Sequence, residues 1–177
     1  MKMSPNGLLI TRHYEDCELT AYLCPAKVWT IGWGHTGSDV YPGLTITQSR
    51  ADELLVEEDL AGCEADVRRL VKVFVTQFQF DALVDFDFNK GGPALAGSTL
   101  LKKVNAGDMK GAADEFLKWI YGGDGSHNGI DDDRDGKIDE PGEKQRLRGL
   151  VRRAHSQRAL FMGASGRDAI QIGLAAA

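Results

Sequence analysis

The spacing of apolar residues predicts that most of the chain is helical. From Thr47 to Leu70, apolar side chains recur every three or four residues, which is the spacing of one face of an α-helix. The same spacing recurs in four later segments, Thr76–Phe88, Ser98–Asn105, Met109–Tyr121 and Gln145–Met162. Glycine-containing turns separate these segments, for example at Gly91-Gly92-Pro93. We therefore expect several packed helices after residue 47.

The N-terminal part of the chain follows a different pattern. Ser4 can cap a short helix that continues to Tyr14, with Pro5 at its first position. From Leu19 to His35 the chain is rich in β-branched and aromatic residues, and a turn-like stretch around Cys24 interrupts it, which predicts a hairpin or small meander. The predicted fold class is thus α+β, with a small N-terminal β-subdomain on a mainly helical body.

The chain has the length of a single domain. A protein of 177 residues buries about two-thirds of the surface of its unfolded chain, so it needs no disulfide or metal to hold its core. Its 42% hydrophobic and 27% charged residues exclude a coiled coil, a collagen-like rod and a wholly disordered chain. We expect one domain over residues 1–163 with an inserted acidic loop at 122–143, then a frayed or weakly helical tail over residues 164–177.

Charge, hydropathy and cysteine content limit the partners. The net charge of −5 argues against nucleic acid as the main partner. No apolar stretch approaches the roughly 20 residues that cross a bilayer, and the first residues lack the apolar core of a secretory signal. Cys17, Cys24 and Cys63 are too few and too irregularly spaced for a disulfide framework or a zinc site. We expect a monomer made in a reducing cytoplasm, without stable membrane insertion.

Three polar side chains of the N-terminal part are candidates for a catalytic cleft. Glu15 lies at the predicted end of the first helix, Cys24 in the turn of the hairpin and Thr30 on the returning strand. Glycoside hydrolysis needs a carboxylic acid on one side of the sugar and a group that holds water on the other. Glu15 suits the role of the acid if partial burial and the neighbouring carboxylate of Asp16 raise its pKa. A solvated glutamate at a helix end is the alternative interpretation.

The sequence around these residues continues in a recognisable order. Glu15 is followed by Cys24 after nine residues and by Thr30 after six more, and then by Gly32-Trp33-Gly34-His35-Thr36. Further blocks are Gln79–Val84, Phe88–Gly91, Ser98–Leu101, Asn105–Trp119 and Gly149–Phe161. Together they resemble the phage-type lysozymes of glycoside hydrolase family 24 over nearly all of residues 5–163, apart from the inserted loop.

The resemblance implies a lysozyme-like fold and the function of an endolysin. Such an enzyme is a muramidase that hydrolyses the β-1,4 bond between N-acetylmuramic acid and N-acetylglucosamine in peptidoglycan, and so lyses the host cell. By this resemblance Glu15 is the general acid, Thr30 positions the attacking water, and Cys24 stands where many members have a catalytic aspartate. Thr36 and Phe88 match positions near the saccharide-binding cleft.

Cys24 leaves the second catalytic role open. A thiol with an ordinary pKa near 8.5 is mostly protonated at neutral pH. Cys24 could be a thiolate base for water, a thiolate nucleophile, or a polar placeholder while Thr30 holds the water. We favour the first or the third, with inversion at the anomeric carbon. An arginine of the basic run could also reach the cleft and oppose the rise in the pKa of the acid, the candidates being Arg148, Arg152 and Arg153.

The inserted loop carries a partial calcium-binding pattern. Oxygen-bearing side chains alternate from Asp131 and a glycine follows at the sixth position, as in an EF-hand, but Gly142 replaces the glutamate of the twelfth position. A second, overlapping frame begins at Asp124. The candidate ligands are Asp124, Asn128, Asp131, Asp133, Asp135 and Asp139. We predict one or two structural Ca²⁺ ions, with a solvated acidic loop as the alternative, and no cofactor for catalysis itself.

Two other functions are compatible with these residues. A lytic transglycosylase needs one acid only, because the 6-hydroxyl of the sugar attacks in place of water. A calcium-dependent wall-binding module would have lost catalysis with the change of an aspartate to Cys24. For an endolysin without a signal segment, we expect storage in the host cytoplasm until a holin opens the membrane and admits it to the periplasm and cell wall.

Overall fold

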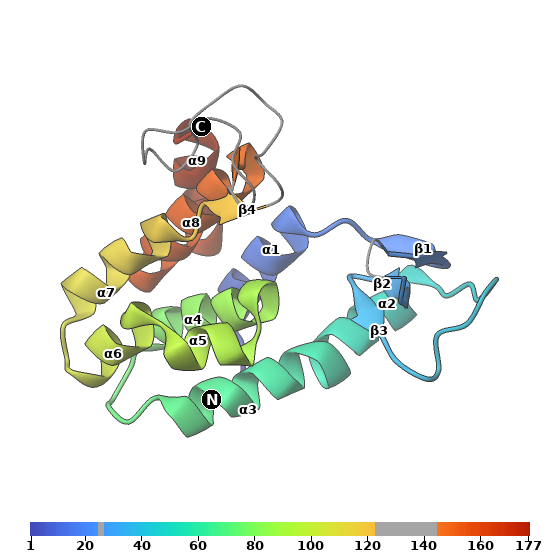
Figure 1. The fold of residues 1–177 in the computed structure, drawn as a ribbon, viewed down its shortest axis with the longest axis horizontal. Helices are drawn as coiled ribbons and strands as arrows, with labels where there is room; N and C mark the ends of the chain where they lie inside the picture. Colours follow the sequence, from blue (N-terminus) through green and yellow to red (C-terminus); the bar gives the residue numbers. More distant parts are fainter. Residues whose placement is uncertain (25–26, 123–144) are drawn as a thin grey trace.

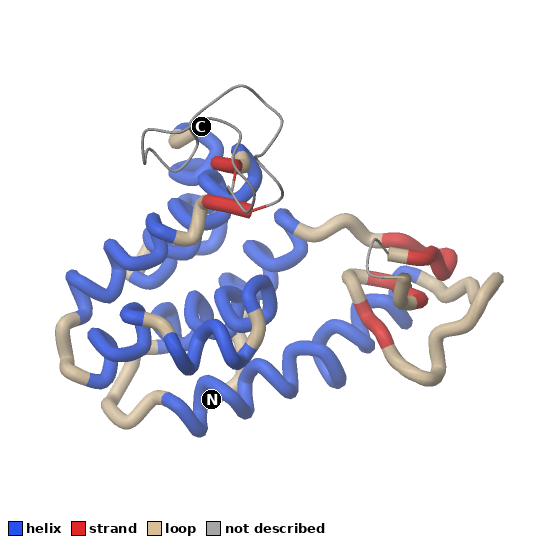
Figure 2. The backbone as a smooth tube through the Cα atoms, viewed as in Figure 1, coloured by secondary structure: helices blue, strands red, loops and turns tan. Residues whose placement is uncertain are grey.

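The computed structural model describes residues 1–24, 27–122 and 145–177. Helices make up most of this part, and a small sheet stands at one end of the molecule (Figures 1 and 2). Within these residues no helix is both long and apolar enough to span a membrane. The α+β fold class predicted from the sequence is confirmed.

The sheet follows the first helix, α1 (Pro5–Tyr14), which Ser4 caps with its side chain. Its three antiparallel strands lie in the order β1 (Glu18–Leu23), β2 (Trp29–Gly32) and β3 (His35–Thr36). Tyr22 lies opposite Thr30, and Thr30 lies opposite Thr36. Because paired residues point to the same side of a sheet, these three side chains share one face. The predicted hairpin or meander is therefore confirmed.

A long helical segment connects the sheet to the rest of the molecule (Figure 1). It consists of α2 (Gln48–Leu54), a π-helical turn over Leu55–Asp59 and α3 (Leu60–Leu70). Thr47, at which the predicted helical spacing begins, caps the start of α2 with its side chain. The wider π turn is not revealed by a spacing of three and four residues. The sheet packs on α2 through a separate small core that consists of Ile31, Val40 and Leu54.

The helical body surrounds α4 (Gln77–Lys90), which is buried at every position from Phe80 to Asp87. Its other elements are α5 (Gly92–Gly97), α6 (Thr99–Asn105), α7 (Met109–Glu115), a 3₁₀ turn (Phe116–Lys118), β4 (Tyr121–Gly122), β5 (Gln145–Arg146), α8 (Arg148–Phe161) and α9 (Gly166–Ala175). β4 and β5 pair antiparallel at the base of the inserted loop. Aromatic rings such as Phe86 and Phe116 fill the core between the helices.

Four segments differ from the sequence prediction. The helix that begins at Met109 ends at Glu115, and Tyr121 belongs to a strand. The helix expected from Gln145 begins at Arg148, because Gln145 and Arg146 form strand β5. The short helix α5 begins within the predicted turn at Gly91-Gly92-Pro93 and continues to Gly97. The tail forms the helix α9, which packs along α8 and buries Ala169 and Ile170. Its small residues permit close packing between helices, whereas the same small-residue-rich pattern in the sequence suggests a frayed or weakly helical tail.

Candidate active site

Glu15 lies at the wall of an open cavity of about 410 Å³. It follows the last turn of α1, where its backbone N–H donates to the carbonyl oxygen of Thr11 at 3.2 Å. Its side chain is 28% exposed, so the carboxyl group is accessible from the cavity but largely removed from water. The other residues lining the cavity are Tyr14, Asn89, Leu147, Gly149, Leu150 and Arg153. Such a site suits an acid that meets a bound substrate.

Arg153 of α8 holds the carboxylate of Glu15 in place. Its Nη1 donates to Glu15 Oε1, while Nε and Nη2 donate to the two oxygens of Asp85 at 3.2 and 2.8 Å. Asp85 is completely buried in α4 and also accepts from Thr11 Oγ1 at 2.8 Å and from Gln157 Nε2 at 2.7 Å. Because four hydrogen bonds fix Asp85, the guanidinium of Arg153 has one orientation, and its third nitrogen, Nη1, points at Glu15.

The surroundings of Glu15 raise its pKa. Burial is the largest cause, and the charge and hydrogen bond of Arg153 act against it, while the carboxylates of Asp85 and Asp16 add to the rise. The direction predicted from partial burial and Asp16 is confirmed. A raised pKa keeps a larger fraction of the carboxyl group protonated near neutral pH, which is what a general acid requires.

The sheet contributes the other polar side chains. Thr30 is 4% exposed and donates from Oγ1 to the carbonyl oxygen of Val28 at 3.1 Å. On the same face, burial raises the pKa of Tyr22, and the charges of Cys24, Glu18, Glu15 and Asp16 raise it further. The charge of Glu15 thus acts on Tyr22, which shares this face of the sheet with Thr30.

Cys24 closes the hairpin between β1 and β2. Its N–H donates to the carbonyl oxygen of Val28 at 3.0 Å, and its own carbonyl accepts from the N–H of Lys27 at 2.8 Å. Lys27 has a φ of 60°, the left-handed conformation that a tight turn requires. The thiol is half-buried. Cys17, Cys24 and Cys63, all within the described residues, form no disulfide.

The family model for phage lysozymes matches residues 12–137, a stretch that includes Glu15, Cys24 and Thr30. The chain belongs to the phage lysozyme family. It is 38% identical over 164 residues to an endolysin of Acyrthosiphon pisum secondary endosymbiont phage 1, which covers 93% of this chain and 100% of that protein. It is 42% identical over 170 residues to an endolysin of Bacillus phage B103, covering 95% of this chain but only 57% of that longer protein.

Solved structures agree with this assignment. The muramidase domain of SpmX from Asticaccaulis excentricus superimposes with a TM-score of 0.78 at 32% identity, covering 92% of this chain and 99% of that domain. The protein is therefore a glycoside hydrolase of the lysozyme type.

The predicted saccharide-binding residues lie in different surroundings. Thr36 is exposed on the face of the sheet that carries Thr30. Phe88 is half-buried against the helical core, and the residue that lines the cavity is its neighbour Asn89. The sequence block that contains Phe88 thus contributes Asn89 to the wall of the cavity in this lysozyme.

Sequence reasoning missed Asp85 and the apolar wall formed by Leu147 and Leu150. Asp85 stands in a run of α4 in which three aspartates occupy buried positions, Asp81, Asp85 and Asp87. Charged residues at core positions of a helix are costly unless they are paired, and this is the signal in the sequence that could have revealed the network. Of the three candidate arginines, Arg153 reaches the cleft, whereas Arg148 donates to the backbone oxygen of Ala177 at 3.0 Å.

His35 is buried and lies between two carboxylates. Its ring is 6% exposed, with Nδ1 2.8 Å from Asp59 and Nε2 3.3 Å from Asp39. Burial by itself lowers the pKa of His35, but the hydrogen bonds and charges of Asp59 and Asp39 outweigh it and raise the pKa. The histidine connects β3 to the π-helical turn and, among the described residues, is not part of the lining of the 410 Å³ cavity at Glu15.

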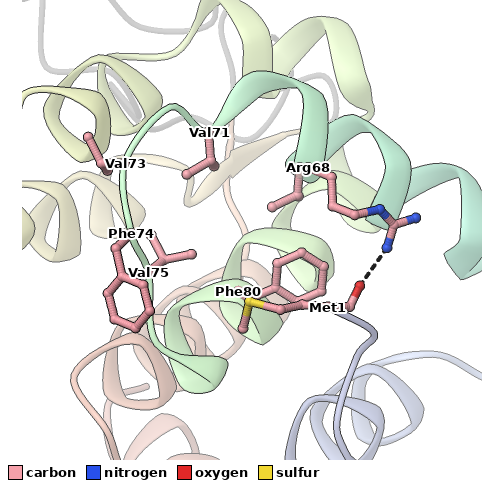
Figure 3. A pocket seen from close by; sticks show the side chains of 8 residues that line it. Met1, Arg68, Val71, Val73, Phe74, Val75 and Phe80 are labelled. Carbon is pink, nitrogen blue, oxygen red and sulfur yellow. Dashed lines mark hydrogen bonds between the residues drawn. The ribbon is translucent and has the colours of Figure 1, made fainter.

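A second cavity, of about 230 Å³, lies between the end of α3 and the start of α4 (Figure 3). Its walls are largely apolar, and Phe74 beside it is 88% exposed. Its charged side chain, Arg68, donates to the carbonyl oxygen of Met1 at 2.5 Å. Because no carboxyl group lines it, this cavity does not suit glycoside hydrolysis.

The predicted calcium ligands, from Asp124 to Asp139, lie outside the described residues. Among the residues that are described, no group of three or more acidic, cysteine or histidine side chains could hold a metal ion.

Proposed function

We propose that this protein is a monomeric endolysin that hydrolyses the β-1,4 bond between N-acetylmuramic acid and N-acetylglucosamine of peptidoglycan. The observation that carries the proposal is Glu15, a carboxyl group with a raised pKa at the wall of an open cavity, held there by Arg153. The endolysins and the muramidase domain that resemble this chain support the same substrate.

In the proposed reaction Glu15 gives its proton to the glycosidic oxygen as the bond to the anomeric carbon breaks. A water molecule attacks that carbon from the opposite side, oriented by the hydroxyl of Thr30, and inverts the configuration. Its proton passes to Cys24 as the base or, if Cys24 is a placeholder, to solvent. Thr30 and Thr36 share a face of the sheet with Tyr22, whose pKa the charge of Glu15 raises, and this supports the division of roles.

The variant Glu15→Gln tests the function. Glutamine cannot donate the proton, so we expect clearing of permeabilised Gram-negative cells to slow by about 10²–10⁴-fold, the usual contribution of a general acid. Unchanged melting temperature would show that the variant is folded, and full bacteriolysis by it would refute the assignment.

Mass spectrometry of the wild-type digest separates a hydrolase from a lytic transglycosylase, because muropeptides that lack one water would identify the transglycosylase.

We also propose that the loop between β4 and β5 binds Ca²⁺. The alternation of Asp131, Asp133 and Asp135, followed by Gly136, supports this, since it brings oxygens to one cation around a sharp turn. Titration calorimetry should show heat with Ca²⁺, and millimolar Ca²⁺ should raise the melting temperature. The double variant Asp131→Asn/Asp133→Asn should lose both effects. Absence of heat and of a melting shift in the wild type would end the proposal.

The protein must also pass from the place where it is made to the cell wall. We propose that the protein waits in the host cytoplasm and reaches the cell wall when a holin opens the membrane. Expression of the chain alone should leave cells intact until chloroform permeabilises them. Since some relatives are named SAR-endolysins, for example that of bacteriophage PS119, lysis upon expression without a holin would instead indicate a release mechanism within the chain.

A further inference from the structure

A chain of hydrogen bonds connects the C-terminal helix to the residue before Glu15. The hydroxyl of Tyr14, the last residue of α1, lies 2.8 Å from Ser156 Oγ in α8. Ser156 Oγ in turn donates to the carbonyl oxygen of Ala169 in α9 at 2.9 Å. A serine hydroxyl has one proton to give, so Tyr14 must be the donor to Ser156. The order of donors therefore runs from α1 through α8 to α9.

The ring of Tyr14 also contacts the arginine that holds Glu15. The guanidinium carbon of Arg153 lies 6.0 Å from the centre of this ring, within the range of a cation–π interaction. Tyr14 is thus held at both ends, by its hydroxyl on Ser156 and by its ring face against Arg153. Since Glu15 is the next residue, the position of Tyr14 determines where the side chain of Glu15 leaves the backbone.

Helix α9 closes tightly over this junction. A Cβ atom added at Gly173 would overlap Ser156 Oγ and the carbonyl oxygen of Arg152, and would lie 2.7 Å from the hydroxyl of Tyr14. The start of α9 is anchored elsewhere, because the N–H of Gly166 donates to Asn6 Oδ1 at 2.8 Å. One part of α9 therefore contacts the junction, and another contacts the start of α1.

We propose that Tyr14 and Ser156 are positioning residues, through which α9 holds the C-terminal end of α1 so that Glu15 stays paired with Arg153. The inference rests on the proposed role of Glu15 as the general acid. Asp85 holds Arg153 independently, so loss of the Tyr14 hydroxyl releases Glu15 rather than the arginine.

Loss of the hydrogen bond between Tyr14 and Ser156 should shift the pKa of Glu15 in one direction. Arg153 from α8 lowers the pKa of Glu15, whereas burial, Asp85 from α4 and the adjacent Asp16 raise it, and Tyr22 of β1 is the further titratable group in range. When Glu15 leaves Arg153 for part of the time but stays at the buried wall of the cavity, it loses the contacts that lower its pKa, so the pKa rises. The activity of a protonated acid is lost above its pKa, so the alkaline limb of the pH–rate profile moves to higher pH.

The variants Tyr14→Phe and Ser156→Ala test the proposal. Measured as release of reducing ends from purified sacculi, each should lower kcat about tenfold because the acid is misplaced, with KM nearly unchanged and the alkaline limb moved upward. Because both remove the same link, the double variant should behave like either single one. Additive losses of kcat, or an alkaline limb that stays in place, would overturn the proposal.

Two glycines of α9 give a matched control. Gly173→Ala places a methyl group in the Tyr14–Ser156 junction and should reproduce the shift of the alkaline limb. Gly166→Ala also overlaps backbone atoms, but those of Asn6, and should lower the melting temperature without moving the limb. If Gly173→Ala fails to fold, Tyr14→Phe decides. A wild-type enzyme that releases no reducing ends would refute the proposed function, whereas an active one whose variants keep the wild-type limb would refute only the positioning role.

Discussion

In the proposed reaction, the role of Cys24 decides whether the attacking water gives its proton to a thiolate or to solvent. A base contributes about 10²–10⁴-fold to such a reaction, and a serine in its place still offers a polar oxygen. We therefore expect Cys24→Ser to keep part of the activity, with kcat falling less than in Glu15→Gln, when turbidity loss is followed on permeabilised cells. Cys17→Ser is the matched control, because Cys17 is also a half-buried thiol but contacts Gln48 outside the cavity.

The anomer formed first separates the roles of Cys24. Direct attack by water inverts the β-linkage, so proton NMR of the fresh product should show the α-anomer before mutarotation. The β-anomer appearing first would require a covalent intermediate and make the thiolate a nucleophile.

At the scale of single residues, the sequence indicates the chemical role of a side chain more readily than the residue with which it forms an ion pair. Glu15 and the direction of its pKa shift were accessible, because the residue type and a carboxylate at the next position are local facts. The partnership of Glu15 with Arg153 joins residues 138 positions apart, and that of Arg153 with Asp85 joins residues 68 apart. The basic run suggested three arginines equally, and only packing of α8 on α4 selects one.

At the scale of helices and strands, some features follow from the local sequence and others from contacts with distant segments. Ser4, Thr47, Thr76 and Ser98 all accept hydrogen bonds from backbone N–H groups at helix starts, where the sequence places helix starts. The π turn and the strands β4 and β5 depend on contacts with other elements, so no spacing of apolar residues reveals them. Helix α9 was expected to be frayed or weakly helical because its glycines lower helix propensity, although the small size of its glycine and alanine residues suits a helix packed closely on α8.

The pairing of β3 with the π turn through His35 predicts a pH-dependent stability. The folded pKa of His35 is raised, so its contribution is complete below the unfolded value of about 6.5 and is lost as pH rises through the higher folded value. Burial raises the pKa of Asp59 despite His35, which gives the same sign at lower pH. Asp59→Asn should lower the free energy of unfolding by about 2 kcal/mol at pH 5 and by less at pH 8, measured by urea denaturation.

Arg50 provides the comparison for this measurement. Its ion pairs with Glu53 and Glu58 are exposed on the same connecting helix and involve no histidine. Arg50→Ala should change the free energy of unfolding by less than about 1 kcal/mol, equally at both pH values. An equal loss at pH 5 and pH 8 in Asp59→Asn would contradict a charged His35.

In the whole molecule, the residues proposed to act on the substrate come from different parts of the fold. Glu15, Asn89 and Arg153 line the cavity of the helical body, whereas Thr30 and Thr36 belong to the sheet (Figure 1). Their separation is therefore set by the joints between α1, the sheet and the connecting helix. The width of the proposed cleft depends on these joints more than on either core.

Asp52 of α2 is such a joint. Its Oδ1 lies 3.2 Å from Arg12 Nη2 of α1 and accepts from Trp33 Nε1, next to β2, at 2.8 Å and from Gln48 Nε2 at 3.1 Å. The guanidinium of Arg12 also lies over the ring of Trp33, 5.8 Å from its centre. One carboxylate thus holds the helical body, the sheet and the connecting helix together.

Removal of the Asp52 carboxylate should make the spacing between the sheet and the helical body less fixed, while both hydrophobic cores stay folded. Because the joint is partly exposed, Asp52→Ala should cost only about 1 kcal/mol of stability, yet raise KM for sacculi several-fold as the sheet and the body lose their fixed separation. Hydrogen exchange should quicken at residues 15–17 and 33–36 while α4 stays protected, since its amides lie in a core that Asp52 does not touch. Asn at this position keeps the oxygen that accepts from Trp33 but loses the charge that attracts Arg12, so Asp52→Asn should give an intermediate KM. Equal KM values in all three proteins would mean that the two sides of the cleft are held by packing alone.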